Sequence, residues 1–273
     1  MTIAMNLVAV HACTTGSTLQ ITLNRPEARN AMSLQMVSEL RQVLQAAEAT
    51  AGQPDAVRVV VLRGAGGHFC AGADLKDMAA ARMQKAEDGS DPIAKVNAEF
   101  GELCVAYANT PLAVVAVLEG TVMGGGFGLA CVADVAIATE TASFRLPETS
   151  LGVVPAQIAP FLVERLGYSQ AKRLAVTGGR LDAAAALHLG LVHEVAGTAT
   201  VQAVLDRVLT DILACAPGAL AATKALMARA RLETPRSLVR DAAAIFSCAA
   251  IGPEGLEGMT AFIQKRKPQW ALP

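Results

Sequence analysis

The amino-acid sequence predicts an α/β protein whose C-terminal part is entirely helical. Three apolar, β-branched runs at residues 57–62, 114–118 and 135–138 have the composition of strands that are buried on both faces of a parallel sheet. Segments with apolar residues at helical spacing lie between these runs, and this alternation favours right-handed β-α-β connections. After about residue 198 no strand pattern occurs, so a helical tail is expected to follow a β/α core.

The first elements are expected to be a hairpin and a helix. Residues 7–13 and 19–23 have strand composition, and the turn residues 14–17 lie between them. Ser33 is a candidate N-cap for the helix that follows. A further core strand is predicted at residues 191–195. The helices predicted in the tail are 201–215, 218–230, 237–250 and 254–266.

The composition argues against several classes of protein. The formal net charge is −1 and no long basic run occurs, so nucleic acid is not an expected partner. No apolar stretch reaches membrane-spanning length and residues 1–10 lack the features of a signal peptide, which predicts a cytoplasmic protein with no membrane partner. The six cysteines form no CxxC pair and match no zinc spacing, so we expect reduced thiols and no metal site.

Two glycine-rich segments carry the chemical information. Residues 67–76 and 120–129 each follow a predicted buried strand, and the second segment opens a helix. Glycine lets the backbone approach a ligand closely, and amides at a helix N-terminus carry partial positive charge. Two such loops on neighbouring strands can each direct one N–H at a single oxygen, which is the arrangement of an oxyanion hole. Tight strand–helix packing alone would also explain the glycines.

Other glycine motifs do not match these segments. Residues 64–69 and 124–129 both fail the dinucleotide-binding pattern GxGxxG at its last glycine. Neither segment ends in the Gly-Lys-Ser/Thr of a phosphate-binding P-loop, and the chain contains no GxSxG nucleophile elbow. The oxyanion interpretation is therefore the one that carries the functional prediction.

Motifs along nearly the whole chain resemble those of the crotonase superfamily, which contains enoyl-CoA hydratases and isomerases. Each motif alone is weak, but their joint order is specific. They are residues 23–27 (LNRPE), 69–75 (FCAGADL), the glycines at 120 and 124–126, and residues 144–148 (FRLPE), 151–155 (LGVVP), 190–192 (GLV) and 262–268 (FIQKRKP).

The resemblance implies a crotonase-like superhelix of β-β-α turns, acyl-CoA thioester substrates and a helical C-terminal trimerisation region. Residues 1–198 would form the core with the CoA-binding and active sites, and residues 199–273 the region that assembles a homotrimer or a dimer of trimers. The implied oxyanion amides are those of Ala73 and Gly125. Coenzyme A arrives with the substrate, so no further cofactor is expected. The residues implied to bind substrate or CoA are Ala71, Ala73, Asp74, Leu75, Lys76, Gly125 and Lys265.

Typical hydratases of this superfamily use two glutamates, and the sequence matches only one of them. Glu148 stands in register with the second glutamate, but Gly128 occupies the position of the first. A lone carboxyl group near an apolar wall would have its pKa raised by desolvation, and it could both accept and donate a proton. Arg145 is a candidate contact for a distal carboxylate. Residues 85–91 are a candidate mobile wall of the acyl pocket.

The leading functional prediction is a hydratase-type lyase acting on a branched, possibly carboxylated 2-enoyl-CoA. The glycine triplet and the segment after Glu148 resemble those of bacterial methylglutaconyl-CoA and isohexenylglutaconyl-CoA hydratases. A Δ3-Δ2-enoyl-CoA isomerase is an alternative, because one glutamate can move a proton between two carbons. A non-catalytic or RNA-binding protein of this fold is a third hypothesis, which the intact loops and the small net charge disfavour.

Five polar residues near these motifs are expected to have structural roles. Asp74 is expected to hold its loop or to face CoA, and Asp134 to support a strand start. His68 and His188 are not expected to act as bases. Cys70, although it adjoins the first glycine segment, is expected to pack in the core. The basic cluster that contains Lys265 could equally be a solvated helix end.

Overall fold

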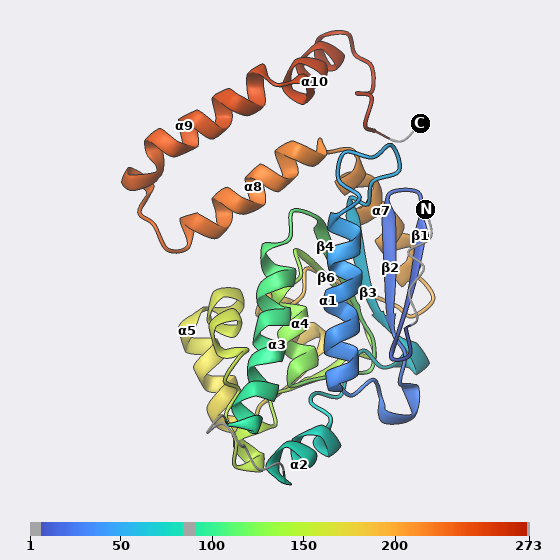
Figure 1. Cartoon of the computed structure of the whole chain (residues 1–273), viewed down its shortest axis with the longest axis vertical. Coiled ribbons are helices and arrows are strands. Elements are labelled where there is room, and N and C mark those ends of the chain that lie inside the picture. The colour runs from blue at the N-terminus through green and yellow to red at the C-terminus, as the bar shows by residue number, and fades with distance from the viewer. Residues whose placement is uncertain (1–6, 84–90, 272–273) are drawn as a thin grey trace.

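The computed structural model describes residues 7–83 and 91–271. The neighbouring strands of its main sheet are antiparallel at the hairpin and parallel elsewhere (Figure 1). In spatial order these strands are β1 (Val10–Thr15), β2 (Thr18–Leu23), β3 (Val59–Gly64), β4 (Ala113–Leu118), β6 (Val135–Thr139) and β9 (Glu194–Ala196).

The α-helices include all four that the sequence predicts in the tail. Three of these, α8, α9 and α10, begin earlier than predicted, because a proline occupies the first helical position, where its missing N–H costs nothing. The helices are α1 (Leu34–Glu48), α2 (Leu75–Met83), α3 (Pro92–Asn109), α4 (Gly125–Val132), α5 (Ala159–Thr177), α6 (Ala183–His188), α7 (Val201–Leu213), α8 (Pro217–Ala230), α9 (Pro235–Ile251) and α10 (Pro253–Ile263), with 3₁₀ turns η1 (Pro26–Ala28), η2 (Ala65–Gly67) and η3 (Glu148–Leu151).

The two faces of the main sheet are covered by different helices, because side chains alternate along each strand. Val60 and Leu62 of β3 belong to the larger core, which also takes buried residues from α1, α3 and α4. Val59 and Val61 belong to a second core on the other face, where α7 contributes Leu205. These four β3 side chains are fully buried, as the sequence predicts.

The predicted N-terminal hairpin and helix cap are confirmed. Thr15 of β1 pairs with Thr18 of β2, so only two residues form the turn, and Gly16 takes a positive φ of 56° there. β1 therefore includes Thr14 and Thr15, which were expected to lie in the turn. The Ser33 hydroxyl accepts a hydrogen bond from Met36 N at 3.2 Å and caps α1.

A small second sheet is absent from the predictions. Its strands are β5 (Thr121–Met123), β7 (Ser143–Arg145) and β8 (Arg180–Asp182), and three residues are too few to show an alternating pattern. β9 is also shorter than predicted. Leu191 N and Val192 N both donate to Ala186 O and so close the end of α6 instead of joining the sheet.

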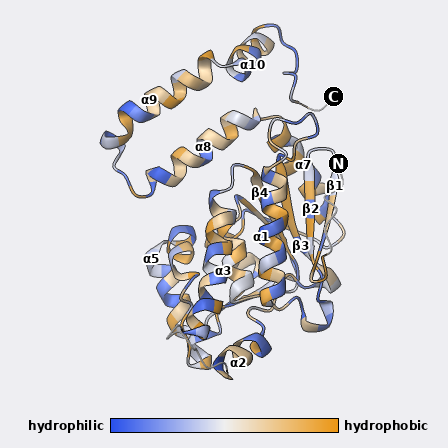
Figure 2. Ribbon diagram, viewed as in Figure 1, coloured by the Kyte–Doolittle hydropathy of each residue, from blue (hydrophilic) through white to orange (hydrophobic). Residues whose placement is uncertain are grey.

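The last three helices extend away from the sheet as an arm (Figure 1). Helix α7 lies in the predicted oligomerisation segment, yet it packs on the sheet. The ribbon in Figure 2 shows many hydrophobic residues along α8 and α9. Within the ranges 7–83 and 91–271, no helix has the length and apolar character needed to cross a membrane. Large exposed apolar side chains on the arm include Met227, Phe246, Ile251, Phe262 and Ile263.

Candidate active site

The structure brings the two glycine segments together. Cys70 and Val122 form an isolated parallel bridge, in which Cys70 N donates to Thr121 O at 3.0 Å and Met123 N donates to Cys70 O at 2.9 Å. Gly72 follows with a φ of 99°, and a Cβ on it would lie 3.3 Å from Met123 O. A side chain at Gly72 would therefore be strained and would press the two loops apart.

The hydrogen bonds on either side of Ala73 turn its backbone N–H away from Met32, the residue that it faces. Met32 N donates to Gly72 O at 2.7 Å, and Asp74 N donates to Met32 O at 3.0 Å. In such a parallel bridge, the intervening residue directs its own N–H to the opposite side. Among the described residues none accepts a hydrogen bond from Ala73 N, and Ala73 lines a pocket of about 180 Å³.

Gly125 presents a second unpaired amide to the same pocket. It is the first residue of α4, and Gly124 before it has a φ of 48°, which a residue with a side chain rarely adopts. Its N–H is one of those at a helix start that lack an intrahelical acceptor, and the described part of the chain supplies none. Ala73 and Gly125 thus both border one cavity with free N–H groups.

Glu148 completes the set of predicted catalytic residues in this pocket. It is the first residue of η3, and its Oε1 would lie 3.1 Å from a Cβ on Gly124. Its Oε2 is buried and has no hydrogen-bond partner among the described residues. Burial raises the pKa of Glu148 above its usual value, and a hydrogen bond with its own backbone amide offsets this only in part. A carboxyl group whose pKa is raised in this way is better suited to both accept and donate a proton.

The position of the missing glutamate is closed by apolar side chains. A Cβ on Gly128 would lie 2.4 Å from Ile158 Cγ2 and 3.5 Å from Phe100 Cζ. Both Ile158 and Phe100 line the pocket, so they form its wall at the position where the resemblance implies the first glutamate of typical hydratases. Gly128 leaves no empty space here, either for a water molecule or for a larger acyl chain.

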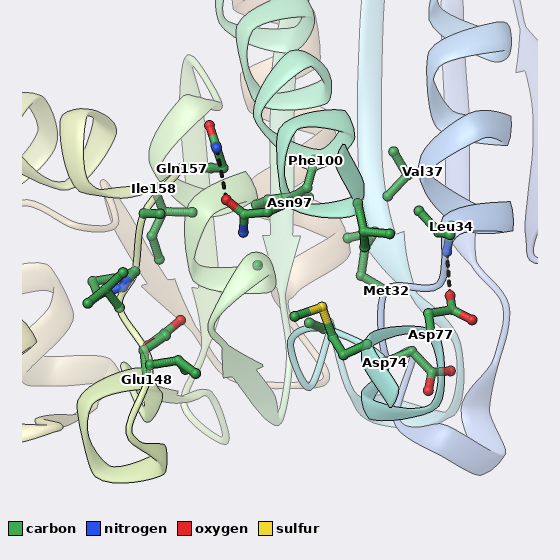
Figure 3. A pocket seen from close by; sticks show the side chains of 18 residues that line it. Met32, Leu34, Val37, Asp74, Asp77, Asn97, Phe100, Glu148, Gln157 and Ile158 are labelled. Carbon is green, nitrogen blue, oxygen red and sulfur yellow. Dashed lines mark hydrogen bonds between the residues drawn. The ribbon is translucent and has the colours of Figure 1, made fainter. Parts of the chain in front are cut away.

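Two amide side chains interrupt this apolar wall. Gln157 Nε2 donates to Asn97 Oδ1 at 2.8 Å, and both residues line the pocket (Figure 3). This pair was not singled out from the sequence: Gln157 lies in the segment after Glu148 that carries the resemblance but was given no role, and Asn97 lies in none of the recognised motifs. A single glutamine and a single asparagine, 60 positions apart, carry no pattern that indicates a site.

Asp74 holds the first loop in place, which is one of the two roles expected of it. Its carboxylate pairs with Arg25 at 2.7 Å and accepts from Lys76 N at 2.9 Å. Burial acts to raise the pKa of Asp74, but the Lys76 amide and the Arg25 guanidinium outweigh it and hold the pKa below its usual value. Asp77 of α2 also borders the pocket and accepts from Leu34 N at 2.7 Å (Figure 3).

Several other candidate residues lie outside the pocket lining. Ala71, Leu75 and Lys76 belong to the same loop and helix start but do not line the pocket. Arg145 does not line it either, so its expected contact with a substrate carboxylate is not supported. Lys265 follows α10 and does not line the pocket; Figure 1 shows α10 and α2 at opposite ends of the molecule. Of the predicted mobile wall, residues 85–90 lie outside the described residues.

His68, Asp134 and Cys70, which were expected to be structural, have structural contacts. His68 Nδ1 accepts from Thr121 N at 3.1 Å and so supports the bridge between the loops. Asp134 accepts from Val114 N at 2.7 Å and pairs with Lys224. Cys70 is fully buried, and this burial raises the pKa of its thiol to about 11. His188 lies in the last turn of α6.

Two free amides beside one carboxyl group define an enzyme-type site that can hold a developing oxyanion and move a proton. The sequence model of the enoyl-CoA hydratase/isomerase family matches residues 14–272, and the chain belongs to this family. Its members act on acyl-CoA thioesters, and the mixed α/β fold with its helical C-terminal region is the crotonase-like fold.

Solved structures and a curated relative share nearly the full length of the chain. An enoyl-CoA hydratase/isomerase from Marinobacter aquaeolei is 52% identical, with a TM-score of 0.92 over 97% of this chain and 99% of that one. Pseudomonas aeruginosa AtuE is 50% identical, with a TM-score of 0.91 over 97% and 100%. The enoyl-CoA isomerase/hydratase fer4 of Mycosarcoma maydis is 34% identical over 91% of this chain and 90% of its own length.

Proposed function

We propose that this enzyme adds water to a branched 2-enoyl-CoA, with Ala73, Gly125 and Glu148 as its catalytic groups. The observation that carries the proposal is the meeting of two unpaired backbone amides and one carboxyl group with a raised pKa in a single pocket. No resident cofactor or metal has a part in the proposed reaction.

The thioester oxygen accepts hydrogen bonds from the amides of Ala73 and Gly125. Ionised Glu148 takes a proton from water as the water oxygen bonds to the β-carbon, and the electrons of the double bond pass to the thioester oxygen. Protonated Glu148 then gives that proton to the α-carbon as the enolate collapses, so the carboxylate is regenerated. Loss of one oxyanion donor typically costs about 3–4 kcal/mol of transition-state stabilisation.

The proposed acyl group is branched and possibly carboxylated, as in methylglutaconyl- or isohexenylglutaconyl-CoA. The apolar wall supports the branched hydrocarbon part, since Val96, Phe100, Val154 and Ile158 all line the pocket. The resemblance of the glycine triplet and the segment after Glu148 to hydratases of such substrates supports the choice within this class.

A Δ3-Δ2-enoyl-CoA isomerase is the second candidate, and one observation favours it. Ile158 and Phe100 close the space beside Gly128, so this wall offers no second carboxyl group to hold the attacking water. A single carboxyl group suffices to carry a proton from the α-carbon to the γ-carbon. The name of the fer4 relative contains both activities.

We also propose that the chain functions as a cytoplasmic homotrimer or dimer of trimers, assembled through residues 199–273. The exposed apolar side chains of α9 and α10 support this, because Phe246 is 75% exposed and Phe262 84% exposed in the single chain. Assembly would let Lys265 reach the CoA phosphates of a neighbouring subunit. Ala71, Leu75 and Lys76 would contact CoA at the pocket entrance.

The deciding experiment incubates the enzyme with 2-enoyl- and 3-enoyl-CoA thioesters and follows both the product mass and the ultraviolet absorbance of the conjugated thioester. We expect one water to add to a branched 2-enoyl-CoA and Glu148→Gln to abolish the addition. Glu102→Gln, an exposed glutamate on α3, is the matched control and should keep full activity. Conjugation of the 3-enoyl substrate without a change of mass would establish the isomerase instead. Full activity of Glu148→Gln would exclude the proposed mechanism.

A further inference from the structure

The Asn97–Gln157 pair has a defined orientation. Gln157 Nε2 donates to Asn97 Oδ1 at 2.8 Å. Figure 3 shows the two polar atoms of the Asn97 carboxamide on opposite sides, with Oδ1 toward Gln157 and the nitrogen away from it. Because Oδ1 is engaged, Asn97 has its NH₂ group left to offer elsewhere.

Gly101 of α3 helps to hold Gln157 in this arrangement. A Cβ at position 101 would lie 2.2 Å from Gln157 Oε1, so the side chain of Gln157 occupies the space that glycine leaves on the helix. Turning the Gln157 carboxamide over on its own would leave two acceptors, Gln157 Oε1 and Asn97 Oδ1, facing each other. The pair therefore has one favoured hydrogen-bonding pattern.

The Asn97 NH₂ group is an unfilled donor at an apolar surface. Among the described residues none accepts from Asn97 Nδ2, while Val96 and Phe100 beside it present hydrocarbon to the same pocket. A purely hydrocarbon chain that covered this donor would remove it from water and leave it unpaired, which is unfavourable. An acyl chain with an oxygen at this place would satisfy it.

Building on the proposed function, we infer that Asn97 determines specificity by donating a hydrogen bond to an oxygen on the acyl chain, other than the thioester oxygen. Gln157 is a positioning residue that orients this donor. The preferred substrates are therefore enoyl-CoA thioesters whose acyl chain carries a carboxylate or a neutral carbonyl or hydroxyl oxygen.

The acidic side chains around the pocket are expected to act differently on a carboxylate and on a neutral oxygen of the acyl chain. The charged side chains among the described lining residues are Asp74, Asp77 and Glu148, all acidic. Arg25 neutralises Asp74, and Asp77 accepts the Leu34 N–H. A neutral oxygen meets no repulsion from these groups, whereas a carboxylate would raise the pKa of Glu148 further and move the pH profile upward.

The test compares three 2-enoyl-CoA thioesters with the same branching, whose acyl chains end in a carboxylate, a ketone or a methyl group. We expect kcat/KM to favour an oxygen-bearing substrate over the methyl analogue by about tenfold or more, the scale of one well-placed hydrogen bond. Asn97→Leu should bring this ratio close to one. Gln157→Glu should do the same with Asn97 intact, because a carboxylate at 157 accepts from Asn97 Nδ2 and turns Oδ1 toward the pocket.

Asn109→Leu, an exposed asparagine at the end of α3, is the matched control and should keep the wild-type ratio. Binding of the three saturated acyl-CoA analogues, measured by calorimetry, provides a readout that needs no turnover. A wild-type ratio near one, or a ratio that survives both Asn97→Leu and Gln157→Glu, overturns the inference. Absence of turnover together with selective binding of the oxygen-bearing analogues would instead reject the hydratase proposal and support the role of Asn97.

Discussion

Ile158 fills the space into which a side chain at position 128 would project. Its Cγ2 atom lies 2.4 Å from the place where a Cβ on Gly128 would be. Ile158 therefore occupies the space beside position 128, and the two positions are sterically coupled. A carboxyl group cannot return to position 128 unless Ile158 is also made smaller.

Gly128→Glu alone is expected to destabilise the protein and not to increase hydration of crotonyl-CoA. Overpacking of this kind typically costs about 1–3 kcal/mol, and the introduced carboxyl group would also be buried. Urea denaturation of Gly128→Glu, Ile158→Ala and the double variant measures the coupling. We expect the double variant to be more stable than the sum of the single changes predicts. Additive effects would show that the two positions are independent.

The raised pKa of Glu148 predicts a pH dependence of catalysis. Glu148 must be ionised to take a proton from water, so kcat/KM should rise with pH through an apparent pKa above the ordinary glutamate value of 4.5. Burial is the main cause of the shift, and a bound acyl chain that excludes more water should raise the pKa further. A pH profile of kcat and of kcat/KM with one substrate tests both statements. A kcat/KM profile that stays flat above pH 4.5 would contradict them.

Arg25→Met is expected to loosen the loop that carries the Ala73 amide. The guanidinium pairs with Asp74 at 2.7 Å and donates to Ala31 O at 2.6 Å, and both charged side chains are mostly buried. Loss of one buried partner typically costs about 1–3 kcal/mol of stability, and we expect kcat to fall more than KM changes. Arg41→Met removes the more exposed Arg41–Glu99 pair and serves as control, with a change under about 1 kcal/mol. Equal effects of the two substitutions would argue against a positioning role for Arg25.

Charged substitutions on the helical arm are expected to abolish self-association. Phe246→Asp combined with Ile251→Asp places two carboxylates on α9, where the single chain leaves 75% and 74% of these side chains exposed. Sedimentation should show a trimer or hexamer for the native protein and a monomer for the variant. Val176→Asp on α5, also in an exposed position, is the control and should leave the assembly intact. A monomeric native protein would reject the proposed oligomer.

The long elements of this fold were predictable from sequence, and the short ones were not. The run at residues 59–62 is apolar at every position, and the structure buries all four side chains between two helical layers. Helix α9 was predicted to within two residues at its start and one at its end, because its apolar spacing continues over 17 residues. β5, β7 and β8 have three residues each, which is too short for a periodic signal.

The same contrast applies to the site. Ala73, Gly125 and Glu148 were found through their motifs, and they line one pocket. Asn97 lies in none of the recognised motifs. Ile158 lies in the segment after Glu148 that carries the resemblance, but it was given no role, because its neighbours Gly128 and Phe100 meet it only through the fold. The proposed role of Lys265 requires a second subunit, about which one chain carries no geometric information.

The hydrogen bond from Leu34 N to Asp77 Oδ2 makes α2 part of the N-terminal cap of α1. Asp77 also borders the pocket, so one carboxylate serves a wall of the binding site and the first turn of a core helix. Any displacement of α2 that widens the pocket removes a favourable charge from the positive end of α1, at a cost of about 0.3–1 kcal/mol. The width of the pocket beside α2 and the fraying of α1 are thereby thermodynamically linked.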